Sequence, residues 1–206
     1  MVVESLLSGM IIGLATGFSP GPLIALVVSE TLKNGKKEGI KVAISPLISE
    51  LPIILFVMLI LSKVAGNFFF LGIISLLGAS FMIFLGVSNI RADAKEGRNH
   101  AGKDSALVRG ITTNLLNPNT YLFWLTIGGP KILESLQTGT LMAIFFVLGF
   151  YTMLVGSKTA MAMVVNKSKT RVKGKYYAHI IRVLGIVLII FALIFLRDAL
   201  AFLGVL

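Results

Sequence analysis

The amino-acid sequence predicts an all-α membrane protein with six transmembrane helices. Three observations support this fold class: the apolar content, the length of the apolar runs, and the alternation of charge between the loops. Hydrophobic residues make up 56% of the 206 residues and charged residues only 14%, with a mean hydropathy of +0.92. Soluble domains carry about a quarter charged and about 45–50% apolar residues, so the excess apolar surface is expected to face lipid.

Six apolar runs are long enough, or nearly so, to cross a bilayer. A hydrocarbon core about 30 Å thick needs roughly 20 residues of helix. A spanning segment must also satisfy its own backbone hydrogen bonds, which favours helices. We expect a single transmembrane domain over residues 1–206, with helices at about 2–29, 42–61, 68–90, 111–129, 141–165 and 180–203.

The basic residues alternate between the loops. Residues 30–41, 91–110 and 166–178 hold most of the 19 Lys and Arg residues. Because positively charged loops stay in the cytoplasm, we predict a multi-pass protein of the cell membrane with these three loops inside and both termini outside. A net charge of +10 in a soluble protein would suggest nucleic acid. Here its placement indicates topology instead, and the two longer loops suit contact with anionic membrane lipids.

The six predicted helices divide into two halves of three. An odd number per half gives the halves opposite orientations, as in transporters built from inverted repeats. The first helix of each half contains proline, namely Pro20 and Pro22 in the first helix and Pro118 in the fourth. The second helix of each half carries one ionisable residue, Glu50 or Lys158. We therefore expect a 3+3 inverted repeat with discontinuous first and fourth helices.

The first candidate binding segment is Ser19-Pro20-Gly21-Pro22. Two prolines remove two backbone donors and clash with preceding carbonyls, and the glycine between them permits non-helical dihedrals. Carbonyls freed in this way are tolerated in lipid only beside protein or a water-filled cavity. We predict that this segment breaks the first helix and contacts a substrate or ion. A kink that serves packing alone is the alternative.

The second candidate segment contains Asn114, Asn117 and Asn119. Three amides near the start of an apolar run are costly unless they are paired, and the residue before a proline disfavours helix. A helix that begins after such a break presents free N–H groups and a positive dipole end to an anionic group. The alternative is a helix cap by Asn117. Tyr121 and Trp124 either line the cavity or pack, and packing is favoured for Trp124.

Glu50 and Lys158 are the only charges well inside the predicted spans. Such residues are functional candidates by default. We expect Glu50 to carry a proton or to bind an ammonium group. Lys158 has three alternatives: counter-ion of Glu50, anchor for a carboxylate, or a lysine that snorkels to the cytoplasmic surface. Pro20, Glu50, Asn117 and Lys158 each lie about seven to nine residues from a cytoplasmic helix end, so they are predicted to share one layer.

Other residues indicate packing or exclude classes of protein. Gly9, Gly13 and Gly17 recur every four residues, which lets a second helix approach closely. The chain has no cysteine and only two histidines, so we expect no thiol chemistry, metal site or cofactor. Neither a zinc-protease motif nor a phosphate-binding loop occurs. An enzyme with catalytic residues is therefore not expected, and an intramembrane enzyme or a scaffold is kept only as an alternative.

Two motifs resemble those of a known family. The segment Gly17-Phe-Ser-Pro-Gly-Pro22 resembles the first-helix Ser-Pro-Gly-Pro motif of the LysE/RhtB superfamily of amino-acid exporters, the LysE-type translocators. The stretch Asn114-Leu-Leu-Asn-Pro-Asn-Thr-Tyr-Leu-Phe-Trp124 is similar to that family's fourth-helix Asn-Pro motif. The glycine-rich residues 35–39 also fit. The layout, with six hydrophobic segments and a long basic central loop, extends the resemblance over nearly the whole chain.

The chain departs from that family at three positions. Many members carry lysine where Asn119 lies, aspartate is usual where Glu50 lies, and Lys158 is not typical. The resemblance implies a secondary exporter of amino acids or closely related solutes, driven by a proton or sodium gradient. In this interpretation the carboxylate of the substrate meets helix N-termini and amides near Gly21 and Asn117, and its ammonium group meets Glu50.

A divalent-cation exporter of similar architecture is the alternative transport function. Metal ions need several oxygen or imidazole ligands, whereas only one carboxylate lies well inside the predicted spans. The substrate and the coupling ion are left open by the residues alone. The oligomeric state is also open, and a homo-oligomer is compatible with the sequence.

Overall fold

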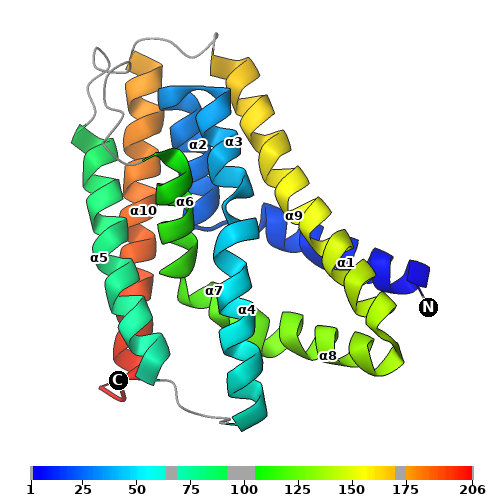
Figure 1. Cartoon of the computed structure of the whole chain (residues 1–206). Helices are drawn as coiled ribbons and strands as arrows, with labels where there is room; N and C mark the ends of the chain where they lie inside the picture. Colours follow the sequence, from blue (N-terminus) through cyan, green and yellow to red (C-terminus); the bar gives the residue numbers. More distant parts are fainter. Residues whose placement is uncertain (1, 64–68, 92–104, 170–174, 206) are drawn as a thin grey trace.

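The computed structural model describes residues 2–63, 69–91, 105–169 and 175–205, and every regular element within these ranges is a helix (Figure 1). Five basic residues that the charge pattern assigns to cytoplasmic loops lie outside the described residues, namely Lys95, Arg98, Lys103, Arg171 and Lys173.

The first predicted span is a bent pair of helices. Helix α1 (Val2–Phe18) and helix α2 (Pro22–Asn34) meet at an angle of 66°. Gly21 precedes α2 in an extended conformation, with φ −171°. Pro22 takes the first position of α2, where a missing N–H costs nothing because that donor has no partner inside the helix. The break therefore lies at the segment where the two prolines predict it.

The second span is longer than the predicted residues 42–61. Helix α3 (Lys36–Ile44) continues into helix α4 (Pro46–Lys63) through Ser45, whose backbone is helical, and residues 36–59 are long and apolar enough to cross a membrane together. Gly35 joins α2 to α3 with φ +94°. Residues that carry a side chain rarely adopt this left-handed backbone region, so glycine is the residue expected at that turn.

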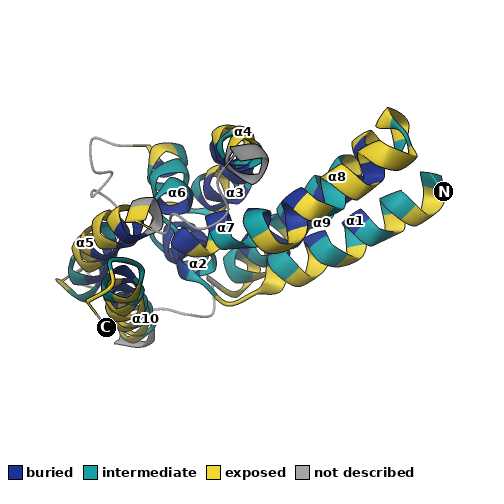
Figure 2. Ribbon diagram, turned by 90° about the horizontal axis from the view of Figure 1, so that it is seen from below, coloured by how far each residue is buried: buried dark blue, intermediate teal, exposed yellow. Residues whose placement is uncertain are grey.

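Three further helices are long and continuous. These are α5 (Phe69–Arg91), α9 (Thr140–Lys169) and α10 (Lys175–Phe202). Helix α5 packs along α10, and α1 packs along the first part of α9 (Figures 1 and 2). Added Cβ atoms at Gly86 and Gly185 would each meet the other residue's carbonyl oxygen, so glycine at both positions lets α5 and α10 approach closely.

The fourth predicted span, residues 111–129, is divided into short pieces. Helix α6 (Ala106–Leu115) is followed by α7 (Pro118–Phe123), a π-helical turn η1 (Trp124–Gly128) and α8 (Gly129–Thr138). None of these pieces has the roughly 20 residues that a bilayer requires. Within the described residues, four helices qualify as spans, and five qualify if the bent α1–α2 pair counts as one. The sixth span and the 3+3 repeat remain predictions.

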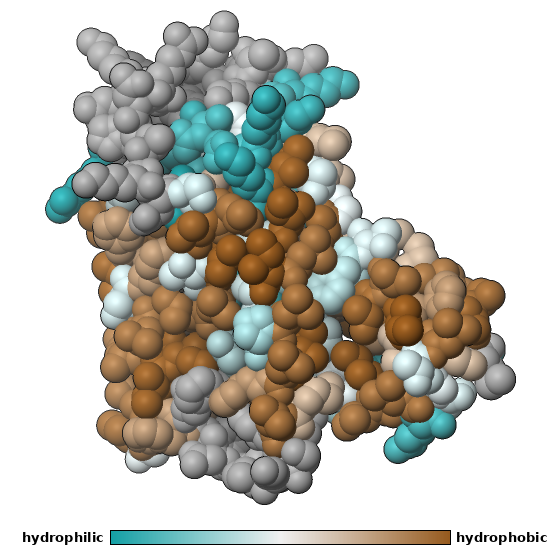
Figure 3. All heavy atoms as spheres, in the orientation of Figure 1, coloured by the Kyte–Doolittle hydropathy of each residue, from teal (hydrophilic) through white to brown (hydrophobic). Residues whose placement is uncertain are grey.

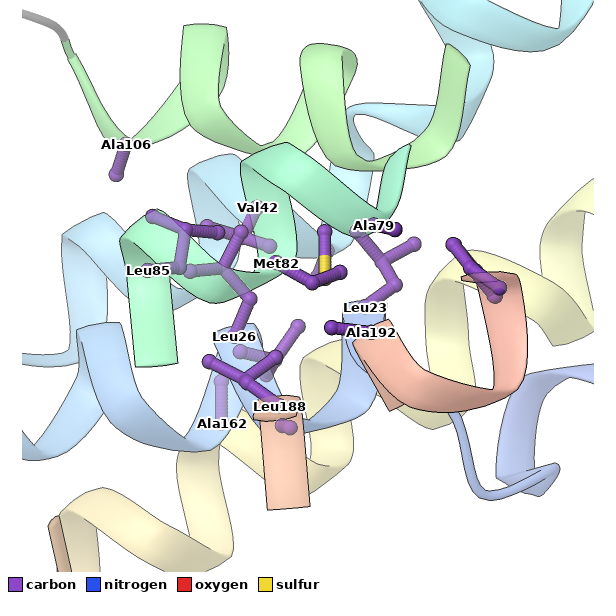
Figure 4. Packing of buried hydrophobic residues seen from close by; sticks show 14 residues of the cluster. Leu23, Leu26, Val42, Ala79, Met82, Leu85, Ala106, Ala162, Leu188 and Ala192 are labelled. Carbon is purple, nitrogen blue, oxygen red and sulfur yellow. The ribbon is translucent and has the colours of Figure 1, made fainter. Parts of the chain in front are cut away.

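Helix α2 lies at the centre of the helices. Leu26 on α2 belongs to a buried cluster with Val42 on α3, Met82 on α5 and Leu188 on α10 (Figure 4). Most residues of α2 are buried. Helices α1, α8 and the first part of α9 extend together away from this group (Figure 2). Because the buried residues of α2 are not confined to one stripe, as they would be in an amphipathic surface helix, α2 is surrounded by protein.

The basic segments gather at one end of the molecule. The α2–α3 turn, the last turn of α5, the first turn of α6 and the last turn of α9 all lie there, whereas the C-terminus lies at the opposite end (Figure 1). Hydrophilic residues cover the described part of that end, and apolar residues cover the sides (Figure 3). This arrangement agrees with the predicted alternation of charge between the loops.

The predicted glycine stripe faces α9. Added Cβ atoms at Gly9 and Gly13 would overlap the carbonyl oxygens of Phe146 and Phe150, and at Gly17 the hydroxyl of Ser157. Backbone atoms cannot move aside as a flexible side chain can. The contact between α1 and α9 therefore depends on the absence of side chains at these positions.

We predict that Gly13→Ala destabilises the protein, whereas Gly156→Ala, the same change on α9, does not. A methyl group at Gly13 overlaps backbone, which typically costs about 1–3 kcal/mol. At Gly156 nothing lies within 4 Å of an added Cβ, and alanine favours helix over glycine by about 1 kcal/mol. Thermal unfolding of the two purified variants in detergent measures the difference. Equal melting temperatures would contradict the proposed α1–α9 contact.

Candidate functional site

A cavity of about 520 Å³ lies where the broken helices meet. Its volume is in the range of small-molecule binding sites, about 300–1,000 Å³. The lining combines the α1–α2 break, the start of α4, the α6–α7 break and one face of α9. All nine residues that the sequence suggests for substrate binding line this one cavity, namely Ser19, Pro20, Gly21, Pro22, Glu50, Asn114, Asn117, Asn119 and Lys158.

Glu50 is held by three hydrogen-bond donors from other helices. The Asn114 amide lies 3.4 Å from Oε1, and the Trp124 indole N–H and the Tyr151 hydroxyl each donate to Oε2 at 3.2 Å. The side chain is buried, and among the described side chains no cation forms an ion pair with it. Hydrogen bonds to a charged oxygen are stronger than neutral ones, so these donors stabilise a carboxylate there.

Tyr151 is not among the residues that the sequence suggests, and packing is the role favoured for Trp124. Tyr151 lies seven residues before Lys158 on α9, so the two share a helix face. That spacing is the sequence signal that points to it. Trp124 is fully buried, and a buried indole N–H usually has an acceptor. An added Cβ at Gly128 would overlap the indole ring, so this glycine leaves room for Trp124 within the π-helical turn.

Asn114 joins three elements through its amide. Its Nδ2 donates to the Ser49 hydroxyl at 2.8 Å as well as reaching Glu50, and its Oδ1 accepts from the Thr120 hydroxyl at 3.2 Å. The residue is buried at the end of α6. Because both ends of the amide are used, Asn114 fixes α6 relative to α4 and α7.

The second break is closed by its own side chains. The Asn117 side chain accepts a hydrogen bond from the Asn119 backbone N–H at 3.1 Å, which caps α7. The Tyr121 hydroxyl donates to the Leu115 carbonyl at 2.9 Å, which satisfies an oxygen at the end of α6. Asn117 therefore acts as a helix cap, one of the two alternatives from the sequence, while both asparagines also line the cavity.

The first turn of α2 faces the cavity without a cap. Gly21 has no side chain to accept from this turn, and Pro22 has no N–H to donate. Leu23 and Ile24 follow, and both line the cavity. The first N–H groups of a helix have no partner within the helix and carry partial positive charge. The start of α2 is thus a place for an anionic group.

Lys158 does not extend toward the basic end of the molecule. Its ammonium group donates to the Gly17 carbonyl at 3.1 Å and lies 3.5 Å from the Thr16 carbonyl, at the last turn of α1. The residue is buried on α9 and forms no ion pair with Glu50. The structure therefore favours a role inside the protein over snorkelling, because the charge lies against acceptors of the broken helix.

The rest of the cavity wall is mostly apolar, and α1 contributes the largest share of it. The wall includes Ile11, Ile12, Phe123, Ile127, Leu154 and Phe191. Among the described residues, no group of three or more His, Cys, Asp or Glu side chains is placed to hold a metal ion. The cavity thus presents one carboxylate, one uncapped helix start, one ammonium group and an apolar surface.

A second polar cluster closes the basic end of α2. Glu30 accepts two hydrogen bonds from the Arg109 guanidinium, at 3.1 and 2.9 Å, and one from the Asn34 amide at 2.7 Å. Beside Glu30 on the same helix, Ser29 and Lys33 both donate to the Asn89 side-chain oxygen. This cluster ties α2 to α5 and α6. Helix α2 runs from the cavity to this cluster, and most of its residues are buried.

We predict that Asn114→Ala lowers the free energy of unfolding by about 1–3 kcal/mol, because it leaves buried partners unsatisfied. The matched control is Asn119→Ala, since Asn119 is exposed and its side chain forms no hydrogen bond with the described residues, whereas its backbone N–H is kept by alanine. That change should stay within about 0.5 kcal/mol of the original. Chemical or thermal unfolding in detergent gives both values. Similar losses in the two variants would show that the Asn114 network does not hold the helices.

Comparison with known proteins finds a family match. The family model described as LysE type translocator matches residues 14–199, a range that contains both helix breaks, Glu50 and Lys158. No curated protein and no solved structure matches the chain. Together with the long apolar helices, the family match indicates a multi-pass membrane protein of a family that translocates small solutes. The chain belongs to the LysE type translocator family.

Proposed function

We propose that this translocator is a secondary active exporter of amino acids or closely related zwitterionic solutes, and that the cavity is its binding site. The observation that carries the proposal is the presence of opposite charges on different walls of one small cavity. Glu50 supplies a negative group, and the uncapped start of α2 supplies a positive one. An amino acid carries the complementary pair of charges.

The carboxylate of the substrate is assigned to the start of α2. The backbone N–H groups of Leu23 and Ile24 belong to the first turn of a helix, and carboxylates bind well at such ends. Asn117 and Asn119 line the same cavity, but the cap of α7 already uses the Asn117 oxygen. The α2 end is therefore the better carboxylate site of the two breaks.

The ammonium group of the substrate is assigned to Glu50. Three donors fix the carboxylate before substrate arrives, which reduces the ordering cost of binding. The substrate side chain then meets the apolar wall, including Phe123, Ile127 and Phe191. The positive charge of Lys158 in this cavity disfavours a second cationic group. Neutral amino acids with apolar side chains are thus the preferred substrate class.

Glu50 is also the group through which an ion gradient can act. Its three donors come from α6, η1 and α9, whereas Glu50 itself lies on α4. A protonated carboxyl group needs an acceptor for its own hydrogen and weakens the bonds that it accepts. Protonation therefore loosens contacts between α4 and the second half of the chain, which is the change that alternating access requires.

Export requires that the substrate enter from the cytoplasm. The charge pattern assigns the basic end to the cytoplasm. That end is closed by α2 and the Glu30–Arg109 cluster. We therefore propose that loading involves separation of this ion pair and movement of α2 away from α6, and that the conformation described here is closed to the cytoplasm.

Counterflow in reconstituted liposomes tests the proposed function. A panel of labelled amino acids and divalent cations is compared in the original protein and in Glu50→Gln, which keeps the shape of the side chain but cannot ionise. We expect saturable exchange of neutral amino acids by the original protein and weaker exchange by Glu50→Gln, because the substrate's ammonium group loses its charged partner. Accumulation driven by a pH gradient should fall further than exchange, by about tenfold or more, because the carboxyl group assigned to carry the proton is lost. Exchange of divalent cations alone would favour the alternative function.

The proposed closure at the basic end is tested by cysteine accessibility. The chain has no cysteine, so Leu26→Cys on α2 provides one buried thiol between the cavity and Glu30. We predict that Glu30→Gln, added to Leu26→Cys, raises about tenfold the rate at which a thiol reagent on the basic side labels this thiol. The reason is that the charge-assisted hydrogen bonds to Glu30, which contribute about 1.5–3 kcal/mol, are lost. Glu38→Gln is the matched control, because Glu38 pairs with Lys41 on the surface of the same end. Equal labelling with both changes would contradict the closure.

A further inference from the structure

The last turn of α1 has carbonyl oxygens without their usual partners. In a continuous helix the Thr16 carbonyl would accept from residue 20, but Pro20 has no N–H. The Gly17 carbonyl would accept from Gly21, whose extended backbone takes its N–H out of the helix. The Ser19 backbone N–H donates to the Thr16 carbonyl at 3.3 Å, whereas outside the regular helical bonds no backbone N–H of the described residues donates to the Gly17 carbonyl. The break thus leaves acceptors at the negative end of a helix dipole.

The ammonium group of Lys158 donates hydrogen bonds to these acceptors. It lies 3.1 Å from the Gly17 oxygen and 3.5 Å from the Thr16 oxygen. Gly17 makes this approach possible, because an added Cβ there would overlap the Ser157 hydroxyl next to the lysine. The short distance between α1 and α9 therefore brings the lysine to the break. The charge is buried, and it is compensated by the dipole and these oxygens.

Carbonyl oxygens at the end of an interrupted membrane helix are the groups that hold coupling metal cations in secondary transporters. Here a side-chain cation is fixed at that kind of position. A further cation in the same cavity would be repelled by the fixed ammonium, and the repulsion between like charges is strong where water is scarce. Glu50, on another wall, attracts Lys158 electrostatically but forms no ion pair with it, so the direct contacts of the ammonium group are the α1 carbonyl oxygens.

We infer that Lys158 is a tethered cation that occupies, at the end of α1, the place of a coupling metal ion. The inference rests on the proposed function as far as coupling is concerned. Two consequences follow. Transport by the original protein does not require Na⁺, because the site is permanently filled. Removal of the lysine side chain opens a cation site at the Thr16 and Gly17 oxygens that a small cation can enter.

Two substitutions separate charge from packing. Lys158→Ala removes both the charge and the side-chain volume, so a small cation can reach the α1 carbonyls. Lys158→Met keeps most of the volume without the charge, and it leaves no room for a cation. Each variant is measured in choline chloride, sodium chloride and n-propylammonium chloride of equal ionic strength. Melting temperature in detergent is one readout and amino-acid counterflow in liposomes is the other.

We expect counterflow by the original protein to be equal in choline and sodium. In choline, the counterflow rate of both variants should fall about tenfold or more, because the buried carbonyl oxygens lose the ammonium group that donates to them. In Lys158→Ala, propylammonium should raise counterflow severalfold and shift the melting temperature toward that of the original protein. Sodium should have the same effects to a smaller degree. Neither cation should rescue Lys158→Met. Equal rescue of Lys158→Met would point to a general salt effect and would overturn the inference.

Three other results would also overturn it: a requirement for Na⁺ in the original protein, unchanged activity of Lys158→Ala in choline, or rescue by neither cation. If neither variant folds, the Na⁺ dependence of the original protein decides the matter. The melting temperature needs no substrate. Absence of amino-acid exchange in the original protein would therefore refute the proposed function, while cation-dependent melting of Lys158→Ala would still support the tethered cation.

Discussion

The structure depends on a constraint of the lipid bilayer: a backbone group that loses its partner there must find another within the protein. Pro20 and Pro22 remove two donors from the first span, and the chain bends by 66° as a result. The two ends of this break are then used in different ways. The carbonyl end is satisfied by Lys158, whereas the N–H end of α2 stays uncapped and faces the cavity.

The same constraint explains the polar network around Glu50. A carboxylate in a membrane is costly unless donors surround it, and the three donors present come from separate parts of the chain. The network therefore has two properties at once. It holds α4, α6, η1 and α9 together, and it is sensitive to any change in the charge of one side chain. The proposed function uses both properties, one for binding the substrate and one for the change of conformation.

Helix α2 connects the site with the basic end of the molecule. It starts at the cavity and ends beside Glu30, which the Arg109 guanidinium holds with two hydrogen bonds. A short helix that is buried along its length, and tied by polar groups at one end, is able to move as a unit when those groups separate. The stripe formed by Gly9, Gly13 and Gly17 keeps α1 against α9. The break between α1 and α2 thus lies between a fixed helix and a helix that is proposed to move.

The sequence by itself determined the helical membrane class, the position of both breaks and the nine predicted residues that line the cavity, because proline chemistry and the cost of buried polar groups act locally. The tertiary structure decided the partners. It placed Trp124 and Tyr151 on Glu50, turned Lys158 to the end of α1, and divided residues 111–129 into short helices. These contacts join residues far apart in the chain. Their geometry depends on how closely whole helices pack, which no local pattern of residues specifies.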